Sequence, residues 1–371
     1  MTRTVTAVFA KLVVVVGFSL HQPYPIHAAG AIVSDTGFEI IPTIVTPSVY
    51  WVDDNRLLFA GIKTADMQKA ITAKEENRVE RLKKLYFWDD ATKSVRLYAD
   101  AQSACFSDGV IHYQVRVDKA AGKVVVKEGP FGSEKEIEKT LPSKDELTWQ
   151  EENKRVRSNF TCRTHLRNEL SPPAPQGRRI IVLREGDGYL DAGPQGTIEL
   201  IGEIRANGPG NIRLFHPGRS APIDLPITLE QGLGVPIYSR YLSAYVTLPR
   251  PKGSDPGHVT EWPRGLPFTV ISFKATGETS EVIIPYDQLV NITWAQPTRM
   301  GWIFGGGNFY KSSGLYVFDG KKVSKIDVGL VREIAVAPDG CRTAVGIENK
   351  HLERGYSPVN LKVFDFCVVG R

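Results

Sequence analysis

The chain carries one motif twice near its C-terminus, as LYVFD at 315–319 and as LKVFD at 361–365. Each copy is a short apolar run that ends in an aromatic residue and Asp, and runs of this length rich in Val and aromatic residues favour β-strands. Between them, PDG at 338–340 separates two further apolar runs, and Asp-Gly is typical of a tight turn. Residues 314–371 therefore predict a repeated unit of short strands joined by tight turns.

The same unit recurs near the N-terminus, where residues 50–62 align without a gap on residues 335–347. In this alignment Asp54-Asn55 falls on Asp339-Gly340, and LYFWD at 85–89 matches the two C-terminal copies of the motif. A weaker copy begins at Cys105. Self-similarity made only of strands and turns predicts radial repetition.

These units resemble WD40 and TolB-like repeats, in which an Asp-Gly turn joins the first two strands of a blade and an aromatic-Asp pair ends the third. The resemblance covers the first and the last two units well and the middle loosely. It implies an all-β fold, a β-propeller of about seven blades with about four antiparallel strands each, since a blade takes about 40–50 residues. Six or eight blades stay open. Residues 30–371 are expected to form one propeller domain, with 158–192 and 197–226 as its third and fourth blades.

The N-terminal segment of this domain lacks a partner within its own unit. Residues 31–45 are strand-like, whereas the last unit has three strands before the chain stops at Arg371. We therefore expect the N-terminal strand to complete the last blade and to close the ring without an exposed edge.

An insertion rich in Lys, Glu and Arg separates the second and third strands of the first unit. Its apolar residues recur at helical spacing, which predicts a short amphipathic helix over 66–85. They are Met67, Ala70, Ile71, Val79 and Leu82. A solvated helix that caps the propeller is favoured over a helix dedicated to a partner.

Residues 1–29 have the pattern of a secretory signal peptide. Arg3 and Lys11 supply positive charge, residues 12–20 an apolar core, and 26–29 a small-residue end. The apolar run is too short to span a membrane, although an uncleaved anchor is the alternative. Removal of two positive charges and no acids would lower the net charge from +5 to +3, which does not suggest nucleic acid as a partner. The sequence thus predicts a periplasmic or secreted monomer with no transmembrane segment after cleavage.

Four cysteines in an exported chain suggest two disulfides. If the two last strands form a hairpin in which Ile347 pairs with Leu361, Cys341 lies opposite Cys367 and can bridge to it. Cys105 and Cys162 would then form the second pair. Free buried thiols are the alternative.

The sequence contains no known catalytic motif, and neither a cofactor nor a metal site is expected. Five histidines after the signal segment are scattered over different units; they are His112, His165, His216, His258 and His351. A propeller of hydrolase or lactonase type that gathers them around an axial metal ion is the main enzymatic alternative. The aromatic-Asp pairs recur with the fold, so we expect their carboxylates to bind turn backbone.

Long loops indicate where a ligand would bind. Four connections between second and third strands are long, at 63–84, 249–265, 305–313 and 348–358, and in a repeat of this type they emerge on one face. Aromatic and Arg residues on such loops suit the binding of a protein, peptide or glycan. The candidate binding residues are His258, Trp262, Arg264, Asn308, Tyr310, His351, Arg354 and Tyr356. TolB-like resemblance implies a scaffold role in the envelope, and an accessory subunit of an envelope complex is a further alternative.

Overall fold

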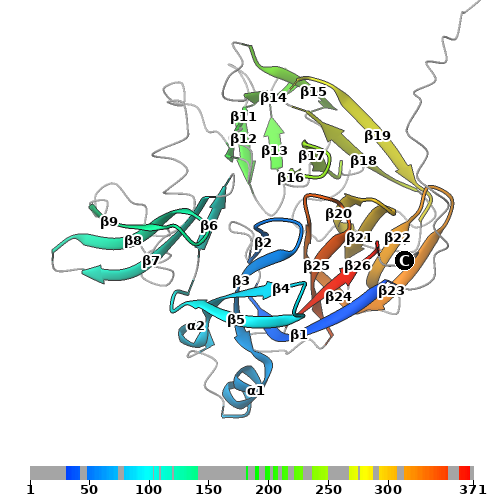
Figure 1. The fold of residues 1–371 in the computed structure, drawn as a ribbon. Helices are drawn as coiled ribbons and strands as arrows, with labels where there is room; N and C mark the ends of the chain where they lie inside the picture. Colours follow the sequence, from blue (N-terminus) through cyan, green and yellow to red (C-terminus); the bar gives the residue numbers. More distant parts are fainter. Residues whose placement is uncertain are drawn as a thin grey trace, which may run out of the picture.

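The protein is described by a computed structural model, in which most of the described residues form short antiparallel strands (Figure 1). The residues described are 31–41, 48–73, 79–102, 104–107, 110–118, 121–140, 181–182, 189–191, 197–200, 204–207, 211–215, 221–228, 236–249, 267–274, 276–286, 292–306, 313–349 and 359–367. Within these residues, no helix has the length and the apolar character needed to span a membrane.

The largest sheet joins the two ends of the chain. Its order is β24-β25-β26-β1-β3-β4-β5, with β2 paired to β3. The strands of the C-terminal half are β24 (Leu330–Val336), β25 (Arg342–Glu348) and β26 (Val359–Asp365). Those of the N-terminal half are β1 (Ile32–Ile40), β2 (Val49–Trp51), β3 (Arg56–Lys63), β4 (Lys84–Asp89) and β5 (Ser94–Ala99). The first and last units of the sequence are therefore neighbours in one sheet.

The N-terminal strand β1 lies on the last unit, as predicted (Figure 1). Ile32 pairs with Asp365 and Ile40 with Val359, antiparallel to β26, and the register shifts between Asp35 and Glu39. Beyond that shift β1 also pairs with β3. The last unit thus receives its fourth strand from the other end of the chain. Closure of the whole ring stays a prediction.

Three further four-stranded sheets follow the chain in simple order. The first contains β6 (Ala104–Ser107), β7 (Val110–Asp118), β8 (Lys123–Pro130) and β9 (Lys135–Thr140). The second contains β16 (Ile237–Ser239), β17 (Ala244–Thr247), β18 (Phe268–Phe273) and β19 (Thr279–Ile284). The third contains β20 (Ile292–Thr298), β21 (Gly301–Gly306), β22 (Gly314–Phe318) and β23 (Val323–Val328).

The middle of the chain differs from the predicted arrangement. The strands there are β10 (Ile181–Val182), β11 (Tyr189–Asp191), β12 (Thr197–Leu200), β13 (Ile204–Asn207), β14 (Asn211–Phe215) and β15 (Ile223–Thr228). Because β11 pairs with β14, strands assigned to separate third and fourth blades share one sheet, β10-β11-β14-β15, and β12 and β13 form a separate hairpin. The described residues therefore form six four-stranded groups, and the blade count of the whole chain stays a prediction.

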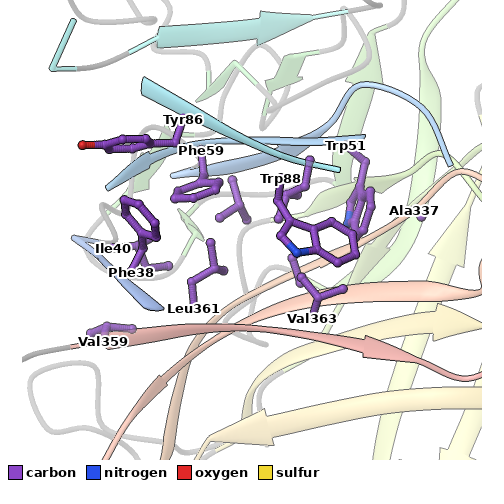
Figure 2. Packing of buried hydrophobic residues seen from close by; sticks show 13 residues of the cluster. Phe38, Ile40, Trp51, Phe59, Tyr86, Trp88, Ala337, Val359, Leu361 and Val363 are labelled. Atoms are coloured by element: carbon purple, nitrogen blue, oxygen red, sulfur yellow. The ribbon is translucent and has the colours of Figure 1, made fainter. Parts of the chain in front are cut away.

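A buried cluster lies where the first and last units meet (Figure 2). Phe38 of β1 contacts Phe59 and Tyr86, with ring centroids 5.6 and 4.4 Å apart. Trp51 and Trp88 pack edge to face at 6.1 Å. Burying one such large side chain stabilises the fold by about 1.5–3 kcal/mol, so this cluster holds the two ends of the chain together.

The predicted helical insertion is present as two short helices, α1 (Thr64–Thr72) and α2 (Val79–Leu82). Met67, Ala70 and Val79 are buried, and Ile71 packs against them, as the helical spacing predicted. The prediction is wrong for Leu82, whose side chain is 39% exposed. Leu82 is the last residue of α2, where the chain turns into β4.

The aromatic-Asp pairs bind turn backbone, as expected. Oδ1 of Asp319 accepts the N–H groups of Lys321 and Lys322 at 2.9 and 2.8 Å. The N–H of Lys322 above all, against a smaller effect of burial, holds the pKa of the Asp319 carboxyl below its ordinary value. Asp89 and Asp365 make the equivalent turn contacts.

The Cys341–Cys367 disulfide is confirmed, with Cα atoms 5.3 Å apart. The register that predicted it was wrong by one residue, because Ile347 pairs with Asn360 rather than with Leu361. The bridge closes a loop with a sequence separation of 26. A loop of this length implies a stabilisation of about 3 kcal/mol in the chain-entropy account. The second predicted pair, Cys105 with Cys162, stays a prediction, because Cys105 lies in β6 but Cys162 lies outside the described residues.

Candidate functional site

Two places on the fold are candidates for binding: the rim from which the long loops leave, and a pocket between the innermost strands. The loop rim is defined here by the ends of β3, β17, β21 and β25. At each of these points the chain leaves the second strand of a sheet and returns as the third.

Strand pairing and close packing place three of these strand ends near one another. Ile62 at the end of β3 pairs with Glu39, which pairs with Asn360 at the start of β26. The end of β25 lies beside it, since Glu348 pairs with Val359. Gly305 of β21 lies so close to β24 that a Cβ there would be 2.4 Å from Val331 Cγ2.

The end of β17, where the fourth long connection begins, is linked to the other three strand ends through the hydrophobic core. Leu248 packs in one cluster with Phe268, Ile292 and Phe304, and Phe304 lies in β21. The second-to-third connections therefore leave from one side of the fold, as the sequence predicted.

The eight predicted binding residues lie on these loops, at 250–266, 307–312 and 350–358, outside the described residues. Their positions relative to one another stay a prediction. The structure describes only the strand ends that hold the loops.

The pocket lies between the first strands of four units, β2 and β24 of the largest sheet, β16 and β20, and is called the axial pocket below. Three of these strands contribute their last residues, Trp51, Ser239 and Val336. The pocket thus extends toward the ends of these strands that precede the first-to-second turns. These ends lie opposite the loop rim, because the second strand of each sheet runs antiparallel to the first.

The polar and aromatic residues of the axial pocket are Tyr50, Trp51, Tyr238, Ser239, Arg240, Trp294, Gln296 and Glu333. Its cavity volume is about 50 Å³. That is room for a few water molecules or for one small chemical group, and far below the roughly 300–1,000 Å³ of a site for a drug-sized ligand.

Hydrogen bonds fix the wall of this pocket. The indole N–H of Trp51 donates to the carbonyl oxygen of Ala335 at 2.9 Å, and Arg240 donates to the carbonyl oxygen of Trp51 at 2.5 Å. The guanidinium of Arg240 also lies 5.6 Å from the ring centre of Tyr50. These contacts tie β2, β24 and the turn after β16 together, so the pocket has a rigid wall.

Two buried side chains bring polar atoms to the same wall. Oε1 of Glu333 accepts the backbone N–H of Ser48 at 2.8 Å and that of Val49 at 3.4 Å. Gln296 is only 3% exposed, and its Nε2 has no hydrogen-bond partner among the described residues. Buried donors in this situation are unusual and call for a partner.

The sequence did not identify this pocket. Its residues lie on first strands whose apolar neighbours look like core, and no motif marks Gln296 or Glu333. One signal was present: polar side chains inside the runs at 292–298 and 330–336, which are otherwise suited to buried strands.

Metal ligands do not gather in the described part of the chain. No group of three or more His, Cys, Asp or Glu residues there is placed to hold a metal ion. His112, in β7, is buried with its Nδ1 2.6 Å from Oε2 of Glu128. His165, His216, His258 and His351 lie outside the described residues.

Among known proteins, the chain is similar only to proteins of solved structure. No family model and no curated protein matches the chain. Among solved structures it is similar to the β-propeller domain of the Trilobed protease from Pyrococcus furiosus, with 12% identity, a TM-score of 0.33, and coverage of 90% of this chain and 85% of that one.

It is also similar to the WD40 repeats of RRP9, with 7% identity, a TM-score of 0.33, and coverage of 91% and 99%. A third neighbour is the acylaminoacyl peptidase of Pyrococcus horikoshii, with 11% identity, a TM-score of 0.40, and coverage of 87% of this chain and 52% of that one. Propellers and WD40 repeats are thus the neighbours. At these TM-scores, they identify no family and no activity.

Proposed function

We propose that this chain is an exported, periplasmic β-propeller that binds a protein, peptide or glycan through its loop rim. The observation that carries the proposal is the grouping of the four long connections at one side of a rigid set of sheets. Loops held in this way suit recognition, because the scaffold fixes their ends while their sequences can vary.

The composition of these loops supports binding rather than simple connection. Five residues of these loops are of the types that dominate the binding energy of protein interfaces. They are Trp262, Arg264, Tyr310, Arg354 and Tyr356. The propeller ring, with about seven blades, would present them around one opening.

Export is tested separately from binding. The full chain is produced in a Gram-negative host, and the cells are separated into periplasm and cytoplasm. We expect the protein in the periplasm with a new N-terminus near Gly30. A protein that stays in the cytoplasm and still begins with Met1 would contradict export. The binding proposal would then be judged by the binding test alone.

Binding is tested with the mature chain as bait and with a rim variant, Trp262→Ala with Arg264→Ala. We expect the rim variant to lose, by about tenfold or more, a partner that the unaltered chain binds from envelope extract or on a peptide or glycan array. Lys321→Ala with Lys322→Ala changes a third-to-fourth turn and serves as the control. Equal binding by the rim variant would contradict the proposal, and recovery only with a large detergent-solubilised assembly would favour an accessory subunit.

A further inference from the structure

The first half of β1 has an open outer edge. Residues 32–35 pair with β26 on one side, and β1 pairs with β3 only from Phe38 onward. Among the described residues no strand pairs with the other side of 32–35, so the backbone groups on that side are open to a further strand. Ile32 and Val33 are each 48% exposed and, as consecutive residues of a strand, lie on opposite faces of the sheet.

This edge differs in charge from the outer edges of the other units. A charged side chain or a proline on an outer strand discourages the addition of another strand. The outer strands β5, β9, β15, β19 and β23 all carry such residues, among them Arg96, Lys135, Asp224, Pro226, Glu281 and Lys325. In the first half of β1, by contrast, residues 31–34 are uncharged and the first charge is that of Asp35. This part of β1 is therefore the outer edge best suited to accept a strand.

The segment 31–35 is complementary to a second copy of itself. Two strands related by a two-fold axis are antiparallel, and one residue lies opposite its own counterpart. If that residue is Val33, the two Val33 side chains contact each other on one face of the sheet. Ile32 then lies opposite Ser34 of the second copy on the other face, and Ala31 lies opposite Asp35. No like charges face each other in this register.

Removal of residues 1–29 would strengthen this pairing. The new α-ammonium group of Gly30 would lie next to Ala31, and hence close to the carboxylate of Asp35 of the second copy. Asp35 is exposed and free to accept this contact. The attraction rests on the proposed export, whereas the pairing of the strands does not.

We propose that the chain forms a two-fold dimer in which β1 of each copy pairs, antiparallel, with β1 of the other. The sheet β24-β25-β26-β1 then continues into the same strands of the second copy. Because the two β1 strands run in opposite directions, the loop rims at their ends face opposite ways, and the dimer can hold two ligands on opposite sides. The proposal departs from the monomer that the sequence predicts.

Sedimentation velocity of residues 30–371, produced without the signal segment, tests the dimer independently of export. Because only about five residues of each copy pair, the interface is small, and we expect the dimer fraction to rise with concentration over roughly 1–100 μM. A mass of one chain throughout this range would overturn the proposal. Growth beyond two copies would overturn the two-fold pairing.

Val33→Lys places two like charges directly opposite each other and should raise the dissociation constant of the dimer at least about tenfold. The matched control is Ile283→Lys, because Ile283 is 59% exposed on the outer strand β19 of another sheet. It should leave the dissociation constant unchanged. An undiminished dimer in Val33→Lys, or an equal loss in both variants, would contradict pairing through β1.

Cross-linking reports the register and does not depend on the lysine variants. Val33→Cys should join two chains through a short bifunctional thiol reagent, since the Cβ atoms of directly opposite residues lie about 5 Å apart. Val328→Cys, at a position of β23 that is 63% exposed, should give no more product than the unaltered chain. Equal cross-linking of both variants would overturn the register.

The dimer and the proposed binding at the loop rim can fail separately. The rim variant, Trp262→Ala with Arg264→Ala, should still form the dimer, because the rim lies outside the β1 pairing. Val33→Lys should still bind the rim's partner at each single rim. Loss of the dimer in the rim variant would overturn the assignment of the interface to β1.

Discussion

The tight turns of the first and last units align in sequence, yet their aspartates make different contacts. In the last unit Asp339 stays within its own turn, where its Oδ1 accepts the N–H of Cys341 at 2.9 Å. In the first unit Asp53 takes that role and accepts the N–H of Arg56 at 2.8 Å. Asp54, which aligns with Asp339, accepts the N–H of Asp339 itself at 2.9 Å.

Asp54 therefore joins the two units. Arg342 reinforces this junction from the other side: it donates to the carbonyl oxygen of Asp54 at 3.0 Å and lies 2.8 Å from the carboxylate of Asp90. Contacts within a turn build each unit, whereas the contacts of Asp54 and Arg342 connect one unit to the next. This distinction predicts where substitutions will cost most.

The largest effect is expected where β1 connects the two units. Phe38→Ala should lower the free energy of unfolding by about 3–5 kcal/mol, because Phe38 is buried between the aromatic rings of Phe59 and Tyr86. Ile32→Ala on the same strand is the control, since Ile32 is 48% exposed and should cost less than about 0.5 kcal/mol. Urea unfolding followed by tryptophan fluorescence measures both. Similar costs for the two variants would show that β1 does not hold the units together.

Strand β1 also carries Glu39, whose ionisation should weaken the contact between the first and last units. Burial, partly offset by a hydrogen bond with Thr64, raises the pKa of Glu39 to about 7 from an ordinary 4.5. The side-chain amide of Asn360, oriented to satisfy both groups, donates to Oε2 of Glu39 at 2.9 Å. Between pH 4.5 and 7 the unfolded chain loses this proton while the folded chain keeps it.

Stability should therefore fall as the pH rises through that window. Glu39→Gln mimics the protonated form and should remove this fall, so that at pH 8 it is more stable than the unaltered chain by about 2 kcal/mol. At pH 4 the two proteins should be alike. Denaturant unfolding at both pH values gives the measurement, and a constant difference between them would rule out titration of Glu39 as the cause.

Much of the fold was readable from the sequence because its signals are local. The aromatic-Asp motifs and the Asp turns set strand ends through contacts within a few residues, and these parts were predicted correctly. The unpaired strand at 31–45 and the incomplete last unit also predicted the pairing of β1 with β26. The middle was not predicted, because the hairpin β12–β13 has the same alternation as the strands around it. A local pattern does not say whether a strand joins the next sheet or forms a hairpin of its own.

The candidate site was predicted only in part, for a related reason. Loop positions follow from strand order, so the loop rim was predictable. The axial pocket depends on which first strands face one another across the fold, from β2 at one end of the chain to β24 at the other. Gln296 and Glu333 are far from Trp51 in sequence, and nothing near them in the chain marks the shared cavity.

The smallest difference in stability is expected between substitutions of the two arginines in the compared turns, Arg342 and Arg56. Arg342 is 17% exposed and lies near three carboxylates, those of Asp90, Asp339 and Asp365, at 2.8, 3.5 and 3.6 Å. Arg56 pairs with Asp53 at 2.6 Å, but both side chains are more than 40% exposed.

Arg342→Met should therefore cost about 1–2 kcal/mol, because it leaves the half-buried acids of two units without their shared cation. Arg56→Met should cost less than about 0.5 kcal/mol, since a surface ion pair is screened by water. Unfolding in high salt sharpens the test, because only the surface pair is strongly screened. Equal costs for both arginines would mean that the contacts between the units add nothing beyond those within each turn.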